Sequence, residues 1–507
     1  MAALFVNGKQ LLISRQRLIR GRIGLVLIAI VTIQYSLFLI PFSVILLPIP
    51  FVWARKLYRR WISTVQLILL GFLGYVVEFV CQVRLVITGA DELLHILPAK
   101  PLIISNHRCD LDWLFIVCLS LRLHRLGALK IATWEEFSQI PFVGWLIQVF
   151  LFPSICGRDK VKDLATLRNT VDYLTAIQHP VGVSVALFPE GSSITSENAI
   201  EKSHRYAEII GMDAQWKNVL IPRSPGMYET VRSLNRLNAL DSVIDVTIGY
   251  LDFSPFQPSN LVSFWTGTYP REVHMHLNHT RWVDIPTDFD SMRSWLIDRF
   301  GVKERLLEKF YQPIEIMYRT NSTDSVGSND SQHDEEDDER LSDQVSTAST
   351  HMSNLATLVS FTDEADTLEP AEETMSKDMR FIQYISNSYV ISAVVAMMVN
   401  FLVVVTIVSY PRETLSYIIG VIVLFSFITR WIGGLNVLEM EILPVQVDLT
   451  YSPEFYGGPD GEPQKPAGLF SVIKNMFVKH KRKEPEYGLR DKQNYIQAIR
   501  QSRSQRK

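Results

Sequence analysis

Four long apolar stretches are the feature that most constrains how this chain can fold. They cover residues 23–53, 61–83, 389–410 and 417–438, and the third contains no charged residue. About 20 apolar residues in a helix are enough to cross the hydrocarbon core of a bilayer. The mean hydropathy of +0.11 over the 507 residues is high for a soluble protein. We therefore expect the chain to be a membrane protein.

The first apolar stretch is too long for one straight crossing. Its roughly 30 residues would form a helix of about 45 Å, against a hydrocarbon core of about 30 Å. Pro41, Pro48 and Pro50 would bend such a helix, and basic residues flank it on both sides, at 9–22 and at 55–60. A bent hairpin suits these charges better than a single crossing, so we expect residues 1–85 to form a membrane anchor.

The last two apolar stretches predict a transmembrane helix pair over residues 386–440. The tail that follows, 441–507, is basic, because residues 465–507 hold 12 Lys or Arg and 3 Asp or Glu. The positive-inside rule places such a tail in the cytosol, and an even number of crossings returns the region before the pair to the same side. We expect the basic tail to contact anionic lipids. The net charge of the whole chain is only −3, which gives no support for nucleic-acid binding.

Two charged residues, Glu78 and Arg430, lie within apolar stretches but close to their ends. We expect their side chains to snorkel toward the membrane surface rather than to mark a functional site.

A strongly acidic segment separates the globular middle of the chain from the last helix pair. Residues 324–373 hold 15 acidic residues and one basic residue, with few apolar ones. Such a composition cannot bury a core, so we expect a disordered linker over 318–385. The remaining globular region is 86–317. There, short apolar runs such as 101–106 and 243–253 alternate with helical patterns, which predicts an α/β domain with a mixed sheet.

The most informative string, S-N-H-R-C-D-L-D-W, occupies residues 105–113, where a buried strand gives way to a helix. His107 lies at this turn, and functional sites of α/β folds collect at such strand ends. Asp112 can reach back to one imidazole nitrogen, which leaves the other free to take a proton from an alcohol. We expect Asp110 to cap the helix.

A second string, L-F-P-E-G-S-S at residues 187–193, follows another apolar strand. Gly191 permits a tight turn there, and Glu190 places a carboxylate at the strand exit. Either string alone has a plain explanation, as a chance His–Asp pair or as an ordinary turn. The chain contains no G-x-S-x-G elbow, because the second glycine is missing here.

Together the two strings resemble the sequence blocks of the glycerolipid acyltransferases, the lysophosphatidic-acid-acyltransferase-like family. The first block, Asn-His-x4-Asp, is matched by Asn106, His107 and Asp112, and the third, Phe-Pro-Glu-Gly-Thr/Ser, by 188–192, with Ser192 at the hydroxyl position. The block between them ends in a phosphate-binding arginine, which corresponds to Arg158. The fourth block is matched by 219–223, which includes Pro222 and Arg223. The blocks occur in family order, and the resemblance covers about residues 60–315.

The strings 106–115, 141–145, 195–208 and 269–276 are most similar to the lysocardiolipin and lysophosphatidylinositol acyltransferase branch. This resemblance implies an enzyme of the endoplasmic reticulum membrane that uses acyl-CoA as co-substrate and needs no cofactor. His107, oriented by Asp112, would deprotonate the free hydroxyl of a lysophospholipid, and the alkoxide would attack the thioester without a covalent acyl-enzyme.

The resemblance also implies roles for the other matched residues. Arg158, helped by Lys130 or Arg223, would hold the phosphate of the acceptor. Glu190 and Gly191, with the neighbouring Ser192 and Pro222, would shape the acceptor site. Backbone N–H groups near Gly191 could stabilise the oxyanion.

Several alternatives stay open at this point. A lysophosphatidic acid acyltransferase of de novo synthesis would carry the same blocks. A lipid hydrolase or transacylase would use water or another lipid as a reaction partner. A non-catalytic lipid-binding scaffold would not need the complete set of His107, Asp112 and Glu190.

Metal chemistry has little support in the sequence. The spacing of the four cysteines matches no zinc or redox motif. His274 and His276 share one face of a predicted strand, with His279 close behind them, but no trio of cysteines or carboxylates accompanies these histidines. We expect these histidines to pack on the strand or face solvent, and we expect no metal site.

Overall fold

The computed structural model describes residues 2–6, 9–13, 15–89, 100–177, 182–196, 198–213, 215–236, 238–250, 261–324 and 371–442. The chain divides into two compact units, residues 1–438 with 445–449, and residues 439–444 with 450–507. Almost all of the second unit lies outside the described residues, so the architecture below is that of the first.

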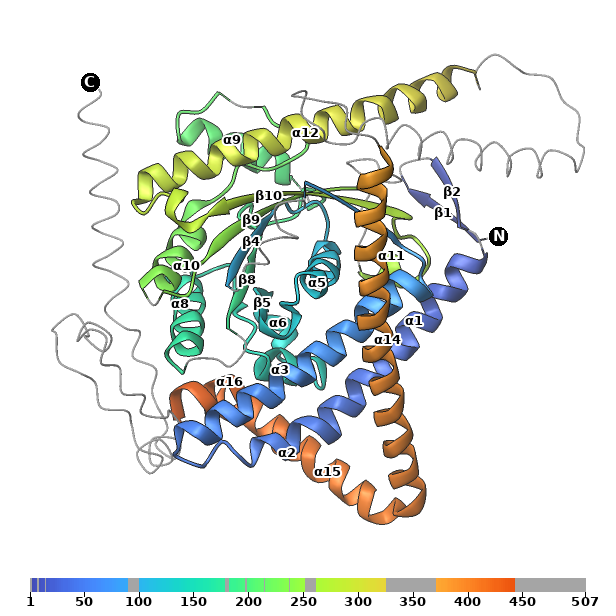
Figure 1. Cartoon of the computed structure of the whole chain (residues 1–507), viewed down its shortest axis with the longest axis vertical. Helices are drawn as coiled ribbons and strands as arrows, with labels where there is room; N and C mark the ends of the chain where they lie inside the picture. The colour runs from blue at the N-terminus through green and yellow to red at the C-terminus, as the bar shows by residue number, and fades with distance from the viewer. Residues whose placement is uncertain are drawn as a thin grey trace, which may run out of the picture. The chain divides into compact units, whose positions relative to one another are not determined.

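A six-stranded sheet forms the centre of the globular domain (Figure 1). In spatial order its strands are β3 (Arg84–Thr88), β10 (Glu272–Arg281), β9 (Ser242–Tyr250), β4 (Pro101–Ser105), β8 (Ser184–Leu187) and β5 (Leu129–Ile131). All neighbours are parallel except β9 and β10. The predicted mixed sheet is confirmed. Strands β4, β5, β8 and β9 are buried along their whole length, as expected where helices cover both faces.

Helices cover the sheet on both sides, with α5 on one side and α8 and α10 on the other (Figure 1). The helices of this domain are α5 (Asp112–Arg122), α6 (Glu135–Ser138), α7 (Val143–Val149), α8 (Lys160–Ala176), α9 (Ala199–Ile209), α10 (Ser224–Arg236), α11 (Leu261–Trp265) and α12 (Phe289–Asp324). A small sheet pairs β6 (Thr133–Trp134) with β7 (Ser154–Ile155), and an N-terminal hairpin pairs β1 (Ala2–Val6) with β2 (Lys9–Ile13).

Side chains alternate along β9 between two helices. Asp245 pairs with Lys303 of α12, and the Phe310 ring of α12 packs against Gly249. Tyr250 points the other way and packs its ring against Phe115 of α5, with 5.7 Å between ring centroids. This two-residue period places Tyr250 on the face of the sheet that carries the start of α5.

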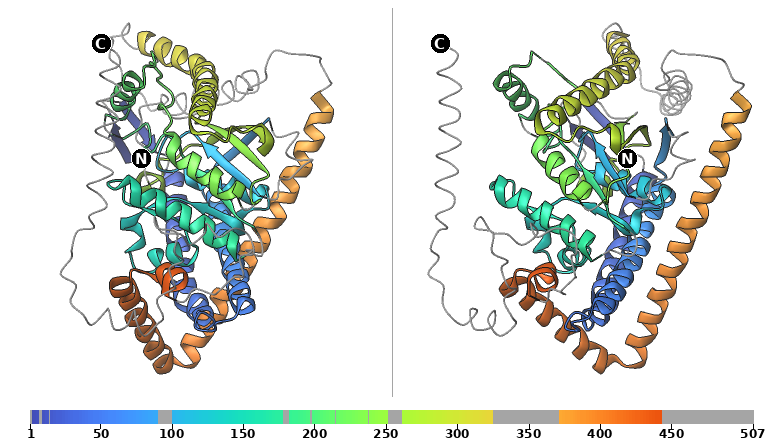
Figure 2. Two further views of the ribbon diagram at one scale, coloured as in Figure 1. Left: turned by 90° about the vertical axis from the view of Figure 1, so that its left-hand side faces the viewer. Right: turned by 60° about the vertical axis from the view of Figure 1, so that its left-hand side comes forward.

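Four helices are long and apolar enough to cross a membrane: Arg15–Val44, Val52–Val80, Tyr389–Ser409 and Pro411–Ile432. They are built from α1 (Arg15–Gln34), α2 (Ile40–Val44), α3 (Val52–Tyr75), α14 (Ala371–Ser409) and α15 (Pro411–Phe427). Short π-helical segments at 35–39, 76–80 and 428–432 extend these helices. The last helix is followed by α16 (Leu435–Val437) and a further π-helical segment, Leu438–Ile442. Helices α1 and α3 run beside one another (Figure 2). The two predicted hairpins are confirmed.

The basic residues expected to flank the first apolar stretch are placed differently. Helix α3 begins at Val52 and takes them in, and Arg55 and Arg59 are buried. Arg55 donates to the carbonyl of Leu47 at 3.2 Å, and Arg59 donates to the carbonyl of Val149 at 3.1 Å. These two arginines therefore fix α3 to its neighbours instead of marking a membrane boundary.

The prediction that Glu78 snorkels is wrong. Its carboxylate accepts two hydrogen bonds from the guanidinium of Arg122 on α5, at 2.7 and 2.8 Å. The hydroxyl of Tyr389 on α14 also donates to Glu78. A charge near the end of an apolar helix is thus compensated by protein groups, and it joins α3, α5 and α14. Arg430 is exposed.

The expected linker and tail can be compared with the structure only at their ends. Helix α12 continues to Asp324, and α14 begins at Ala371. Residues 325–370, which are most of the predicted linker, lie outside the described residues. So do residues 443–507, which are nearly all of the predicted basic tail.

Candidate active site

The turn that carries His107 is pinned to the sheet by the residue before it. Asn106 is buried after the end of β4, and its side-chain amide donates to the carbonyl of Ile248 at 3.0 Å. Its Oδ1 accepts the N–H of the same residue at 2.7 Å. This pair of bonds resembles the backbone hydrogen bonds between two strands, so the position of the turn over β9 does not depend on loop packing alone.

His107 and Asp112 form the predicted pair. His107 Nδ1 lies 2.8 Å from Asp112 Oδ2, and because a carboxylate only accepts, Nδ1 carries the proton. Nε2 is then the basic nitrogen. The His107 side chain is 21% exposed and that of Asp112 is fully buried. The ring of Phe188 stacks on the imidazole with 4.5 Å between centroids and limits its rotation.

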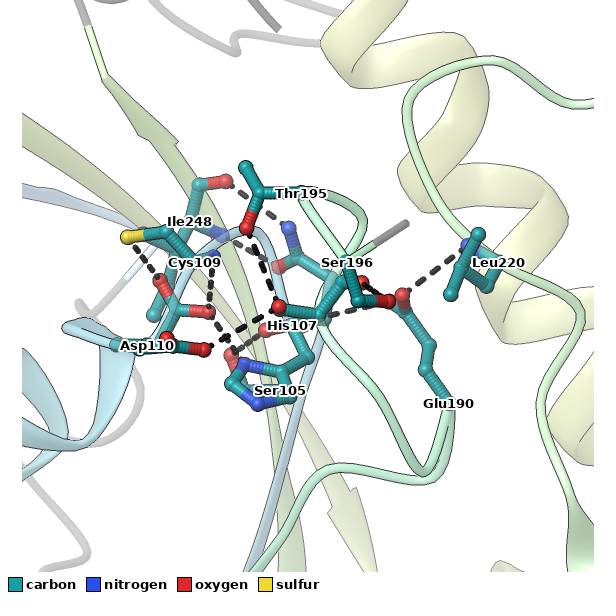
Figure 3. Close-up of polar contacts among 12 residues, drawn as sticks. Ser105, His107, Cys109, Asp110, Glu190, Thr195, Ser196, Leu220 and Ile248 are labelled. Atoms are coloured by element: carbon teal, nitrogen blue, oxygen red, sulfur yellow. Dashed lines mark hydrogen bonds and ion pairs between the residues drawn. The ribbon is translucent and has the colours of Figure 1, made fainter. Parts of the chain in front are cut away.

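Asp112 is held by other donors as well as by His107. Besides His107, the N–H of Cys109 donates to Oδ2 at 3.0 Å, and the hydroxyl of Tyr250 donates to Oδ1. Asp110, expected to cap the helix, does not do so, because the residue before α5 is Leu111 and no side chain caps it. The carboxylate of Asp110 instead accepts from Ser193 at 3.3 Å, which joins the two sequence strings (Figure 3).

Glu190 ties the blocks together from inside the protein. Its carboxylate is buried and accepts the N–H of His107 at 3.0 Å and the N–H of Leu220 at 3.1 Å (Figure 3). Burial raises the pKa of the Glu190 carboxyl well above its usual range, against the effect of these two hydrogen bonds. Glu190 therefore organises the backbone of the site, and its carboxylate is not presented to solvent.

Gly191 and Arg223 lie next to each other at the surface of this site. Gly191 has a φ of +74°, a conformation that side chains disfavour, and a Cβ there would lie 3.7 Å from Arg223 Cδ. The N–H of Arg223 donates to the carbonyl of Pro189 at 2.7 Å, while its side chain is exposed. Pro222 is buried beside it, and Ser192 is half-buried.

The N–H of Gly191 itself does not serve as an oxyanion donor. It donates to the carbonyl of Phe188 at 3.0 Å and closes the turn. The expectation concerns backbone N–H groups near Gly191, and for the neighbouring N–H groups it stays a prediction.

Two other predicted phosphate ligands behave differently from Arg223. Arg158 follows β7 with a side chain that is 85% exposed, and it pairs with Glu136 of α6 at 3.5 Å. No contact in the described part of the chain joins Arg158 to the His107 turn. Lys130 is buried and donates to Gln66 of α3 at 3.0 Å and to the carbonyl of Phe150 at 2.7 Å. Its role as a phosphate helper is therefore wrong, since its ammonium is used to fix α3 to the sheet.

The histidines of β10 have structural contacts. His274 is buried against the ring of Phe310 and lies 3.0 Å from Glu272, and His276 bonds Thr88 at 3.1 Å. Within the described ranges no group of three or more His, Cys, Asp or Glu side chains could hold a metal ion.

Tyr250 and the backbone N–H of Cys109 also contact Asp112, and neither contact was predicted from the sequence. Cys109 lies within the string at 105–113, only three residues before Asp112, so the sequence spacing is compatible with this contact. Tyr250 is 138 residues away from Asp112 and belongs to no recognised block. Only its place at the end of a buried strand could have suggested it.

The chain matches two family models and several named proteins. The family model "Acyltransferase" matches residues 85–250, and "Acyltransferase C-terminus" matches residues 263–327. The protein named lysocardiolipin acyltransferase 1 of Danio rerio is 33% identical over 47% of this chain, which spans 58% of that relative. Its namesake of Mus musculus is 31% identical over 53% of this chain and 68% of the relative.

Two further proteins extend the comparison. The Caenorhabditis elegans protein named lysophosphatidylinositol acyltransferase 10 is 29% identical over 54% of this chain and 67% of its own length. The crystal structure of the 1-acyl-sn-glycerophosphate acyltransferase from Thermotoga maritima overlaps 58% of this chain and 97% of its own at a TM-score of 0.34 and 16% identity. The sequence matches, which include the whole sheet and the His107 turn, show that this chain belongs to the acyltransferase family that includes proteins named lysocardiolipin and lysophosphatidylinositol acyltransferase.

Proposed function

We propose that this protein transfers a fatty acyl group from acyl-CoA to the free hydroxyl of a lysophospholipid. The observation that carries the proposal is the His107–Asp112 pair, in which one nitrogen is fixed by a buried carboxylate and the other is left as a base. The side chain of His107 is partly exposed, so a substrate hydroxyl can reach it. A histidine held in this way is suited to general-base catalysis.

The proposed reaction proceeds in one addition and one elimination. His107 Nε2 takes the proton of the acceptor hydroxyl as its oxygen forms a bond to the thioester carbonyl carbon. The tetrahedral intermediate then collapses, the C–S bond breaks, and coenzyme A leaves as a thiolate. The imidazolium can return its proton to that thiolate, so the enzyme ends in its starting state.

The acceptor phosphate would be bound by arginine. Arg223 supports this role because its exposed side chain lies beside Gly191, next to the loop that carries Glu190. Arg158 remains a second candidate at the edge formed by β6 and β7. Arginine suits the task because its planar guanidinium can bind two phosphate oxygens at once.

The acceptor class follows the names of the relatives, which point to lysocardiolipin or lysophosphatidylinositol. Lysophosphatidic acid, the acceptor of de novo synthesis, would use the same chemistry. We further propose that the protein resides in the endoplasmic reticulum membrane with its catalytic domain on the cytosolic side. Protease digestion of sealed microsomes tests this orientation, since protection of the catalytic domain would contradict it.

The activity is tested by measuring coenzyme A release and diacyl lipid formation with purified protein in detergent. The donor is oleoyl-CoA, and the acceptors are lysophosphatidic acid, lysophosphatidylinositol, lysophosphatidylglycerol and monolysocardiolipin. His107→Ala should lower acceptor-dependent release by about 10²–10⁴-fold, the usual contribution of a general base. The matched control is His279→Ala. His279 is a partly exposed histidine on β10 that pairs with Ile244 of β9, six residues along that strand from Tyr250.

The outcomes separate the alternatives. Release that needs both one acceptor and His107 supports acyl transfer and identifies the head group. Release without any acceptor would indicate a thioesterase or hydrolase. No release with any acceptor would favour a lipid-binding scaffold, and full activity of His107→Ala would remove the mechanism.

A further inference from the structure

Tyr250 extends the His107–Asp112 pair into a row of three side chains. Its hydroxyl donates to Asp112 Oδ1, while Oδ2 of the same carboxylate accepts from His107 Nδ1. The two contacts lie on opposite oxygens, so Tyr250 and His107 draw on the same negative charge. The phenol reaches Asp112 from the end of β9, far away in the sequence.

The surrounding protein leaves Tyr250 little freedom to move. Its side chain is buried, its ring packs against Phe115, and its backbone N–H donates to the hydroxyl of Tyr311 on α12 at 2.9 Å. The thiol of Cys109 lies 3.5 Å from the Tyr250 hydroxyl and 3.7 Å from Asp112 Oδ1. A phenol held so firmly fixes the rotation of the carboxylate that it touches.

The state of the phenol is also defined by its surroundings. Burial, followed by the charge of Asp112, raises the pKa of Tyr250 well above its ordinary value of 10.0. The hydroxyl therefore keeps its proton at every pH at which a histidine base can work, and it remains a donor.

We propose that Tyr250 is a positioning residue for the acyl transfer, and that its hydroxyl bond to Asp112 sets how strongly that carboxylate holds the proton of His107. This inference rests on the proposed function, because it assigns Tyr250 a part in the same reaction. A hydrogen bond to a carboxylate stabilises its negative charge and makes it a weaker proton acceptor. Without the phenol, Asp112 attracts the imidazole proton more strongly, and His107 is protonated over a wider pH range.

Other charged or titratable groups face this row from several elements, and they stay unchanged in the test below. They are Cys109 and Asp110 in the turn before α5, Glu190 after β8, and Lys303 and Tyr311 on α12, with Arg108 stacked 4.2 Å from the Tyr311 ring. Because these groups are the same in wild type and in Tyr250→Phe, a changed pH profile of the variant reports the loss of one hydroxyl.

The test compares Tyr250→Phe with Tyr311→Phe in the full-length protein. Tyr250→Phe should lower kcat by about 10- to 100-fold, as expected for the loss of one hydrogen bond to a charged group. It should also move the acid limb of the kcat/KM profile to higher pH by about 0.5–1 unit. Tyr311→Phe removes an equally buried hydroxyl, which accepts the backbone N–H of Tyr250 and has no hydrogen bond to Asp112 among the described residues, and it should leave the profile in place.

A second readout does not depend on catalysis. Diethyl pyrocarbonate modifies neutral imidazole, so the rate at which it labels His107 at each pH, followed by peptide mass spectrometry, reports the protonation of that ring. The labelling profile should shift by the same amount and in the same direction in Tyr250→Phe. If the wild-type protein showed no acyl transfer, the proposed function would fail, while this measurement would still decide the role of Tyr250.

A variant that keeps the ring and the hydroxyl covers the case in which Tyr250→Phe does not fold. Incorporating 3-fluorotyrosine at position 250 makes the phenol a stronger donor, so both profiles should move to lower pH. Profiles that coincide with wild type in Tyr250→Phe, or in the fluorinated protein where the first does not fold, would overturn the proposal. So would an equal shift in Tyr311→Phe, since the effect would then be structural.

Discussion

The ion pair between Glu78 and Arg122 offers a direct test of how the membrane helices and the catalytic domain are joined. Arg122 lies in the last turn of α5 and binds both carboxylate oxygens of Glu78, at 2.7 and 2.8 Å. The hydroxyl of Tyr389 donates to Glu78 and accepts from Arg122 at 3.1 Å. Both charged side chains are nearly buried, with exposures of 6% and 12%.

The expected effect of breaking this pair is large because the partner that remains is a buried charge. Removing one member of a buried ion pair costs about 3–5 kcal/mol. At about 2–4 °C per kcal/mol for a domain of 150–250 residues, Arg122→Met should lower the unfolding temperature by roughly 6–20 °C. Replacing both partners, in Glu78→Leu with Arg122→Met, should restore much of this loss, since apolar substitutes of similar volume remove the uncompensated charge.

The assay is the temperature at which half of the detergent-solubilised protein remains monodisperse on gel filtration. The matched control is Arg205→Met, which breaks the exposed pair of Arg205 with Glu201 and should change stability by about 0–1 kcal/mol. If Arg122→Met unfolded within a degree of wild type, or if the double variant were as unstable as the sum of the two single ones, the pair could not be a buried link between these helices.

Three further predictions concern the site and the linker. Glu190→Gln should destabilise the fold by about 1–3 kcal/mol, because a single amide oxygen cannot replace two carboxylate oxygens that each accept a backbone N–H; denaturation in detergent measures this. Arg223→Ala and Arg158→Ala should each raise the acceptor KM by about tenfold with kcat nearly unchanged, with the larger effect at Arg223, and an unchanged KM would return either residue to a structural role. Deleting 325–370 should leave kcat within about twofold of wild type, because the segment is rich in acidic residues and poor in apolar ones, and a complete loss of transfer would make this segment part of the catalytic unit.

The titration of Glu190 should make the free energy of unfolding depend on pH. Because burial raises its pKa, the folded protein binds this proton more tightly than the unfolded chain does. Stability contributed by this group is therefore full at low pH and declines as the pH rises from about the unfolded value of 4.5 through the folded pKa. The decline should be absent in Glu190→Gln, where nothing titrates.

Local patterns in the sequence were sufficient to predict the α/β class, the four apolar helices and the His107–Asp112 pair, although not the order of the strands in the sheet. All three depend on residues close together in the chain. Strand and helix periodicity act over a few residues, and Asp112 is only five positions from His107. The contact of Glu190 with His107 was missed although both residues were singled out, because it joins a carboxylate to a backbone N–H, which no side-chain pattern reports.

The wrong predictions concern charged residues whose partners are distant in the sequence. Glu78 pairs with Arg122, 44 positions away, and with Tyr389, 311 positions away. Lys130 donates a hydrogen bond to Gln66, which lies 64 positions before it in the sequence. For each of them the sequence shows a lone charge, for which solvent or a ligand is the natural partner. Only the assembled fold supplies the hydrogen-bond partners that make burial tolerable, which are donors for Glu78 and acceptors for Lys130.

Helix α5 connects these two sets of contacts. Its first residue, Asp112, holds His107 and is held by Tyr250, and its last, Arg122, is bound by Glu78 and Tyr389. An 11-residue helix is a stiff rod of about 16 Å, so a displacement at one end is carried to the other. A shift of the membrane helices that moved Arg122 would therefore also move the carboxylate that orients the base. The two helix pairs thus form part of the framework that sets the geometry of the site, in addition to any role in anchoring the chain to a bilayer.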